Sequence, residues 1–121
     1  MARVLVIEDN PSNMTLATFL LNSAGHTVIS ATDAEAGVML ARTQQPELIL
    51  MDIQLPGMDG LEAIRRLRAD PEFRTLPIIA LTALAMPGDR ERCLAAGATD
   101  YVTKPISLKR LAAMIDENLL M

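Results

Sequence analysis

The chain has 121 residues, of which 50% are hydrophobic and 21% are charged, a length and composition that fit one compact domain over residues 1–121. It contains neither a run of the roughly 18 to 20 apolar residues that would cross a bilayer nor the hydrophobic stretch of a secretory signal, so we expect a cytoplasmic protein with no membrane partner. The net charge of −4 argues against nucleic acid as a partner. The chain has one cysteine, Cys93, so an internal disulfide is excluded, and one histidine, His26, so there are too few ligands for a dedicated zinc site.

The first half of the chain predicts three short strands that alternate with two helices. Each strand is a run of β-branched and leucine residues without polar alternation, which is typical of strands buried on both faces. Asn10-Pro11 reads as a helix cap followed by proline at the first helical position, and Thr32 with Glu35 has the spacing of a capping box. The predicted strands are 3–7, 26–31 and 48–51, and the predicted helices are 11–24 and 33–43.

The second half of the chain continues the same alternation. Pro56-Gly57 and Pro87-Gly88 mark two loops, and the apolar residues from Leu108 to Leu119 recur at the spacing of an amphipathic helix. The predicted helices are 61–69, 89–96 and 108–119, and the predicted strands are 77–81 and 101–103.

This order of elements predicts an α/β fold, a doubly wound, five-stranded parallel sheet flanked by five helices. Right-handed crossovers restrict the strand order to a few possibilities. In such sheets ligands bind beyond the carboxyl ends of the strands, at the point where the strand order reverses. Functional residues are therefore expected where the strands end.

The residues at the predicted strand ends are polar or charged. Glu8 and Asp9 follow the first strand, Asp52 the third, Thr82 the fourth and Lys104 the fifth. Three carboxylates in one crevice repel one another, and the usual remedy is a hard divalent cation with oxygen ligands, which indicates Mg²⁺. A metal site, a lysine and a hydroxyl around one aspartate are the partners that a phosphoryl group needs. Each of these residues alone has an ordinary structural explanation, but the combination favours a site that binds a metal ion and a phosphoryl group.

With these residues in this order, the chain resembles the receiver domain of two-component response regulators, the CheY-like family, along its whole length. The resemblance is carried by Glu8-Asp9, by Asp52 within the segment 50–60, by Thr82-Ala83, and by Tyr101 three residues before Lys104-Pro105. The surrounding sequence is most similar to stand-alone receivers of the DivK kind and to receivers of hybrid histidine kinases. The family implies a flavodoxin-like fold with strand order 2-1-3-4-5 and a function in a phosphorelay.

The resemblance implies that Asp52 is the phosphoacceptor, phosphorylated from the phosphohistidine of a histidine kinase or a histidine phosphotransferase. It also implies that Mg²⁺, which Mn²⁺ could replace, is bound directly by Asp9, Asp52 and the backbone carbonyl of Gln54, and through a water molecule by Glu8. Many family members have aspartate where this chain has Glu8, and the glutamate keeps the negative charge.

The remaining positions of the family's site are also filled. Lys104 and Thr82 would contact phosphoryl oxygens through their side chains, and Ala83 through its backbone amide. Thr82 and Tyr101 would form the switch, and the Lys104-Pro105 peptide would be cis. The last predicted helix runs to the end of the chain, so the expected output is binding of a downstream protein through the face of helix 89–96, strand 101–103 and helix 108–119.

Three other functions fit parts of this pattern. A flavodoxin-like electron carrier shares the architecture, but Glu8 and Asp9 place two anions where the phosphate of its flavin would bind. A phosphatase of the haloacid dehalogenase family needs an acid two residues after its nucleophile, where this chain has Gln54. A pseudo-receiver that binds a partner without phosphorylation is the main alternative, although the acidic set with Lys104 argues against it. We expect a signalling protein rather than an enzyme, one that catalyses only its own phosphoryl transfer and slow self-dephosphorylation.

Overall fold

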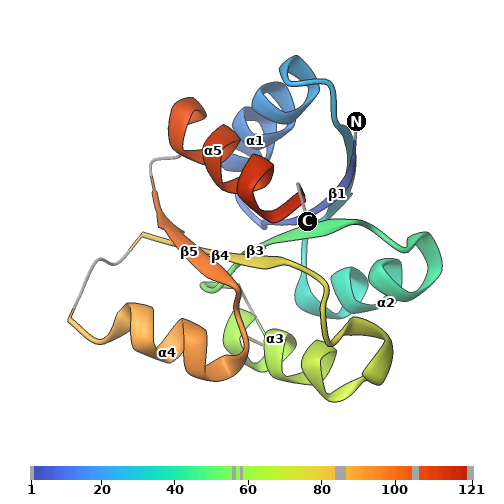
Figure 1. Ribbon diagram of the computed structural model, residues 1–121, viewed down its shortest axis with the longest axis vertical. Helices are drawn as coiled ribbons and strands as arrows, with labels where there is room; N and C mark the ends of the chain where they lie inside the picture. The colour runs from blue at the N-terminus through green and yellow to red at the C-terminus, as the bar shows by residue number, and fades with distance from the viewer. Residues whose placement is uncertain (1, 56, 58, 84–86, 105–106, 120–121) are drawn as a thin grey trace.

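A sheet of five parallel strands forms the centre of the computed structural model, which describes residues 2–55, 57, 59–83, 87–104 and 107–119 (Figure 1). The strands lie in the order β2-β1-β3-β4-β5. Their bounds are β1 (Arg3–Ile7), β2 (Thr27–Ala31), β3 (Leu48–Asp52), β4 (Ile78–Thr82) and β5 (Asp100–Thr103). The predicted fold class and strand order are confirmed, and the predicted strand bounds differ from these by at most one residue.

Five α-helices cover the two faces of the sheet (Figure 1). On one face lie α1 (Pro11–Ser23) and α5 (Leu108–Leu119), and on the other lie α2 (Ala34–Gln44), α3 (Gly60–Ala69) and α4 (Asp89–Ala96). A short 3-10 helix, Pro71–Phe73, follows α3. Within the described ranges, no helix is both long and apolar enough to cross a membrane.

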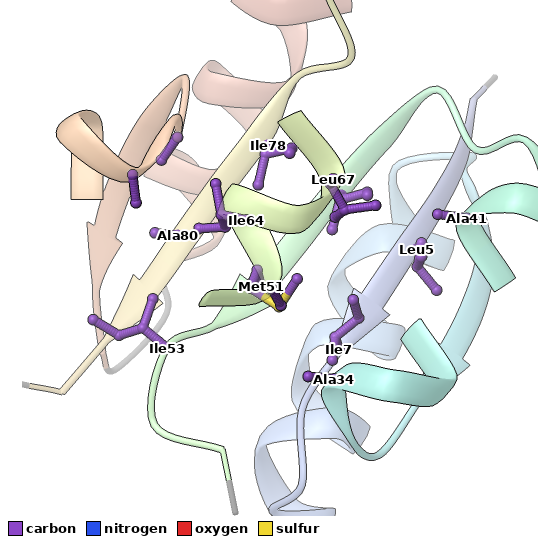
Figure 2. Packing of buried hydrophobic residues seen from close by; sticks show 14 of the residues in the cluster. Leu5, Ile7, Ala34, Ala41, Met51, Ile53, Ile64, Leu67, Ile78 and Ala80 are labelled. Atoms are coloured by element: carbon purple, nitrogen blue, oxygen red, sulfur yellow. The ribbon is translucent and has the colours of Figure 1, made fainter. Parts of the chain in front are cut away.

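The strands are buried on both faces because their side chains alternate between two hydrophobic clusters. Leu5, Ile7 and Met51 pack with residues of α2, α3 and α4 (Figure 2). Val6 and Leu50, their neighbours in the chain, pack with residues of α1 and α5. Successive strand side chains point to opposite faces, so a sheet covered on both sides requires uninterrupted apolar runs. Full burial of one such aliphatic side chain stabilises the fold by about 1.5 to 3 kcal/mol.

Short polar side chains cap the first turns of α1, α2 and α3. Asn10 caps α1 by accepting two N–H groups of its first turn, and Pro11 takes the first helical position, as predicted. The predicted capping box at Thr32 is wrong, because the cap of α2 is Asp33. Asp33 has the extended backbone of a cap residue, and its carboxylate accepts the Ala36 N–H at 2.8 Å.

Helix α3 begins directly against the strand end that carries Asp52. Gly60 is its first residue, and a side chain there would collide with backbone atoms of Asp52 and Ile53. The Gly60 N–H also donates to the Ile53 carbonyl at 3.2 Å. Only glycine permits this close approach, which holds α3 against the end of β3.

We expect Gly60→Ala to destabilise the protein by about 3 kcal/mol, the upper end of typical overpacking costs, because the new Cβ meets backbone rather than a side chain that can rotate away. Gly57→Ala is the control. Its Cβ would meet nothing within 4 Å, and its positive φ of 77° costs about 1 to 2 kcal/mol. Chemical denaturation measures both losses, and equal losses at the two glycines would contradict the close-packing argument.

Candidate functional site

Charged side chains from distant parts of the chain converge at the carboxyl ends of the strands. Glu8 and Asp9 follow β1, Asp52 ends β3, and Lys104 follows β5. Strands β1 and β3 are neighbours in the sheet although β2 lies between them in the chain. The strand order therefore reverses at this point, which is where ligands bind in open α/β sheets.

Lys104 lies between two of the carboxylates. Its Nζ is 3.0 Å from Glu8 Oε1 and 3.1 Å from Asp52 Oδ2. The side chains of Glu8 and Asp52 are 1% and 2% exposed, and that of Lys104 is 14% exposed. Two negative charges thus share one positive charge in a place that water hardly reaches, and loss of any partner would leave a buried charge less compensated.

The environment raises the pKa of both Glu8 and Lys104, for different reasons. The pKa of Glu8 lies above its ordinary value of 4.5, first because burial disfavours the carboxylate and then because Asp52 is beside it. Burial alone would lower the pKa of Lys104, but its contacts with Glu8 and Asp52 outweigh burial and hold this pKa above 10.5. Lys104 is therefore an ammonium at neutral pH, whereas the charge on Glu8 is unfavourable.

Three carboxylates at this site are close enough to ligate one ion. Glu8, Asp9 and Asp52 each offer an oxygen, and these oxygens lie within 4.8 Å of one another. Glu8 Oε2 accepts the Asn10 N–H at 3.2 Å, and Asp52 Oδ1 accepts the Gln54 N–H at 2.9 Å. Glu8 Oε1 is buried and lies 3.0 Å from the Lys104 ammonium. Carboxylate oxygens with unused lone pairs are the ligands that suit Mg²⁺.

The end of β4 adds a hydroxyl and a backbone donor. Thr82 is the last residue of β4 and is fully buried. The next residue, Ala83, donates its N–H to Gln54 Oε1 at 3.4 Å. Gln54 thus contacts two parts of the site, Asp52 through its backbone and Ala83 through its side chain. The family resemblance implies a role for Gln54 only through its backbone carbonyl, as a metal ligand, so this side-chain contact is not among the predictions.

The two residues predicted to form a switch lie on the same face of adjacent strands. Ala80 pairs with Tyr101, and Thr82 pairs with Thr103. Residues i and i+2 of a strand share a face, so Thr82 lies on the side of the sheet where Tyr101 packs beside Ala80. Pro105, which belongs to the predicted cis peptide, lies outside the described residues.

The contact between Lys104 and Glu8 is a feature that sequence reasoning missed. The family resemblance implies that Lys104 contacts a phosphoryl group and Glu8 a metal-bound water, whereas the structure places the two side chains 3.0 Å apart. The residues come from opposite ends of the chain, so no local spacing signals the contact.

The chain is similar to known signalling proteins over nearly its whole length. The response regulator receiver domain family matches residues 4–116. The polar-differentiation response regulator DivK of Brucella anthropi is 44% identical over 112 residues, which cover 93% of this chain and 91% of that protein.

Solved receiver structures share the fold. The receiver domain of the sensor histidine kinase PA1611 from Pseudomonas aeruginosa, solved with a magnesium ion coordinated in its active-site cleft, has 41% identity and a TM-score of 0.92. The match covers 99% of this chain and 98% of that domain. A putative response regulator from Chloroflexus aurantiacus has 28% identity and a TM-score of 0.95, with the same coverage of both chains.

The raised pKa of Glu8 predicts how stability depends on pH in the metal-free protein. The folded state favours the protonated carboxyl, an advantage that is present below pH 4.5 and is lost as the pH rises through the higher folded value. Glu8→Gln stays neutral, so the free energy of unfolding of this variant relative to wild type should increase over that range. Urea denaturation in EDTA measures the difference.

The control for this pH series is Glu117→Gln, which changes an exposed glutamate of α5. A difference between Glu8→Gln and wild type that stays constant or shrinks as the pH rises would show that Glu8 is not penalised by burial.

Proposed function

The chain belongs to the response regulator receiver domain family, and we propose that Asp52 is the residue that takes up the phosphoryl group. As a member of this family it is a phosphorylation-accepting domain of two-component signalling, and we treat residues 1–121 as one such domain. The observation that carries the assignment is the position of Asp52. It is a buried carboxylate where the strand order reverses, 3.1 Å from the Lys104 ammonium.

The proposed reaction is transfer from the phosphohistidine of a histidine kinase or a histidine phosphotransferase. A carboxylate oxygen of Asp52 attacks the phosphorus, an O–P bond forms, and the N–P bond of the donor breaks with its electron pair returning to the imidazole nitrogen. During the transfer, negative charge spreads over the phosphoryl oxygens. Lys104, already beside Asp52, offsets that charge without having to move in from solvent.

The carboxylate cluster is the proposed Mg²⁺ site. Asp9, Asp52 and the Gln54 carbonyl would hold the ion directly and Glu8 through a water molecule, with Mn²⁺ as a possible substitute. A bound ion supplies positive charge beside the phosphoryl oxygens. Support comes from the three carboxylate oxygens, which lie within 4.8 Å of one another. The similar Pseudomonas aeruginosa domain holds a magnesium ion in its active-site cleft.

Thr82 and Ala83 complete the proposed phosphoryl site. The Thr82 hydroxyl would donate to one phosphoryl oxygen and the Ala83 N–H to another. In the unphosphorylated chain the Ala83 N–H donates instead to Gln54 Oε1, at 3.4 Å. A neutral hydrogen bond of this length is weak, so it is readily exchanged for a charge-assisted bond to a phosphoryl oxygen.

The proposed output is a change in the surface formed by α4, β5 and α5. Thr82 and Tyr101 share a face of adjacent strands. When the Thr82 hydroxyl moves toward a phosphoryl oxygen, it vacates space that the Tyr101 ring can enter, and the surface changes shape. Coupling between two such sites is typically about 1 to 3 kcal/mol, enough to change the affinity for a downstream protein at least several-fold.

A phosphorylation-independent interaction module is not favoured. Such a module would have no use for a buried aspartate that shares a lysine with a second carboxylate, because this arrangement lowers stability. The chain is a signalling protein, and the only catalysis that we propose is phosphoryl transfer to Asp52 and slow hydrolysis from it.

Acetyl phosphate with Mg²⁺ should add one phosphoryl group to the protein, at Asp52, because the side chains that stabilise the transfer belong to the receiver itself. Intact mass spectrometry measures the addition. Asp52→Asn and removal of Mg²⁺ with EDTA should each abolish it, whereas Asp116→Asn, an exposed position on α5, should not. If Asp52→Asn is phosphorylated as fast as wild type, the assignment is wrong.

Thr82→Ala should still be phosphorylated at Asp52 but should lose the change at the α4, β5 and α5 surface, because the hydroxyl that senses the phosphoryl group is gone. Amide exchange with and without beryllofluoride measures this change, for which we expect about fivefold or more in wild type. Thr75→Ala, at an exposed position, is the control. Wild-type changes confined to α1, α2 and α3, or an unaltered response in Thr82→Ala, would refute the proposed switch.

A further inference from the structure

The side chain of Arg68 joins three segments at the end of the sheet opposite to the phosphoryl site. Its Nε donates to the Gly97 carbonyl at 2.7 Å, and its Nη1 donates to the Phe73 and Leu76 carbonyls, both at 2.6 Å. Its Nη2 donates to Thr99 Oγ1 at 3.1 Å. These acceptors lie in the 3-10 helix after α3, in the segment before β4, and in the α4–β5 loop. We call this group of hydrogen bonds the Arg68 clasp.

The clasp places a positive charge among neutral acceptors. Among the described residues, no carboxylate lies within 4.0 Å of Arg68, whereas Arg65 and Arg66 of the same helix pair with Glu62 at the surface. Burial lowers the pKa of Arg68. A guanidinium presents several N–H donors in a rigid fork, which suits it to hold several carbonyl groups at once. The geometry therefore fits a connector between segments better than a solubilising surface charge.

Gly97 adapts the end of α4 to the clasp. Its φ of 115° ends the helix in the left-handed region, and a Cβ there would lie 2.6 Å from Arg68 Cγ. Thr99 ties the same loop to the start of β4, because its N–H donates to the Ile78 carbonyl at 2.7 Å and its hydroxyl accepts the Ile78 N–H at 3.1 Å. The C-terminal end of α4 is thereby fixed to both α3 and the sheet.

The N-terminal end of α4 is built differently. Its cap residue is Gly88, which provides no side-chain cap, and a Cβ there would meet nothing within 4 Å. This end follows the segment that leaves Thr82 and Ala83 of the phosphoryl site. Helix α4 thus has one end held by the clasp and one end that continues from the site.

We propose that Arg68 is a positioning residue that makes the C-terminal end of α4 a fixed pivot, so that phosphorylation displaces mainly the N-terminal end. The inference rests on the proposed function, in which α4 forms part of the output surface. A helix held at one end responds to a change at its other end by tilting as a unit, a small motion of a packed element. The clasp would therefore shape the surface seen by a partner without contacting the partner or the phosphoryl group.

Residue-resolved amide exchange in Mg²⁺, with and without beryllofluoride, tests the pivot at two amides. The Arg92 N–H donates to the Gly88 carbonyl at 2.9 Å and reports on the site end, while the Ala98 N–H donates to the Cys93 carbonyl at 3.0 Å and reports on the clasped end. We expect beryllofluoride to change exchange at Arg92 by about fivefold or more and to leave Ala98 unchanged. Equal changes at the two amides would overturn the pivot.

Arg68→Lys keeps the stem and the charge, but its compact ammonium cannot hold the same set of carbonyls. In this variant the beryllofluoride-dependent change should spread to Ala98, whereas Arg66→Lys, the same change on the exposed side of α3, should keep the wild-type pattern. The wild-type pattern in Arg68→Lys would overturn the proposal. If that variant does not fold, Thr99→Val removes the side-chain acceptor of the clasp and should shift the pattern in the same direction.

For each amide, the ratio of the exchange rates with and without beryllofluoride separates a positioning role of Arg68 from a general loss of stability. A general loss of stability would change the exchange rates with and without beryllofluoride by the same factor. The Gln54 N–H, which donates to Asp52, reports beryllofluoride binding at the site itself. Changes at Gln54 and Arg92 with an equal change at Ala98 would overturn the pivot and leave the assignment of Asp52 intact. The absence of change at all three amides would contradict the proposed function and the pivot with it.

Discussion

The rest of the site depends on the two ion pairs of Lys104. Its ammonium is shared between the buried carboxylates of Glu8 and Asp52. A parallel sheet places the carboxyl ends of its strands at one edge, so charges that follow β1, β3 and β5 meet there because of the topology. Two anions with one cation in a nearly dry place are unfavourable for stability. The same excess of negative charge would attract a divalent cation, and in the proposed function the ammonium would meet the phosphoryl oxygens.

The site is flanked by the start of α3 on one side and by the segment that leads to α4 on the other. On the α3 side, Gly60 packs against the backbone of Asp52, so the proposed phosphoacceptor and the start of α3 are held together. On the α4 side, Thr82 and Ala83 lead into the segment before α4, a helix whose far end is held by Arg68. In the proposed function, a change of hydrogen bonding at a phosphoryl group on Asp52 would be transmitted toward α4 rather than α3. The chemistry of one carboxylate would thereby be connected to the shape of a distant surface.

Much of this organisation could be predicted from the sequence because strands buried on both faces need uninterrupted apolar runs. Such a run ends where the first polar residue follows it, and Asp52 could therefore be placed at the end of a strand. The start of α2 was predicted one residue early because Thr32 and Asp33 are both good cap residues, and only the backbone conformation distinguishes them. The contact between Arg68 and Gly97 joins two segments that are distant in the chain, so no local spacing could reveal it.

In the proposed site, the carboxylate cluster is short of positive charge, and Lys104 and Mg²⁺ would interact with the same carboxylates. Titration calorimetry of Mg²⁺ with wild type and with Lys104→Met tests it most directly. Removing the ammonium removes its repulsion of the metal and its hold on Glu8 and Asp52, and charges this close interact by several kcal/mol even when screened. We expect Lys104→Met to bind Mg²⁺ about tenfold more tightly or better, a gain of about 1.4 kcal/mol or more. Unchanged or weaker binding in Lys104→Met would contradict it.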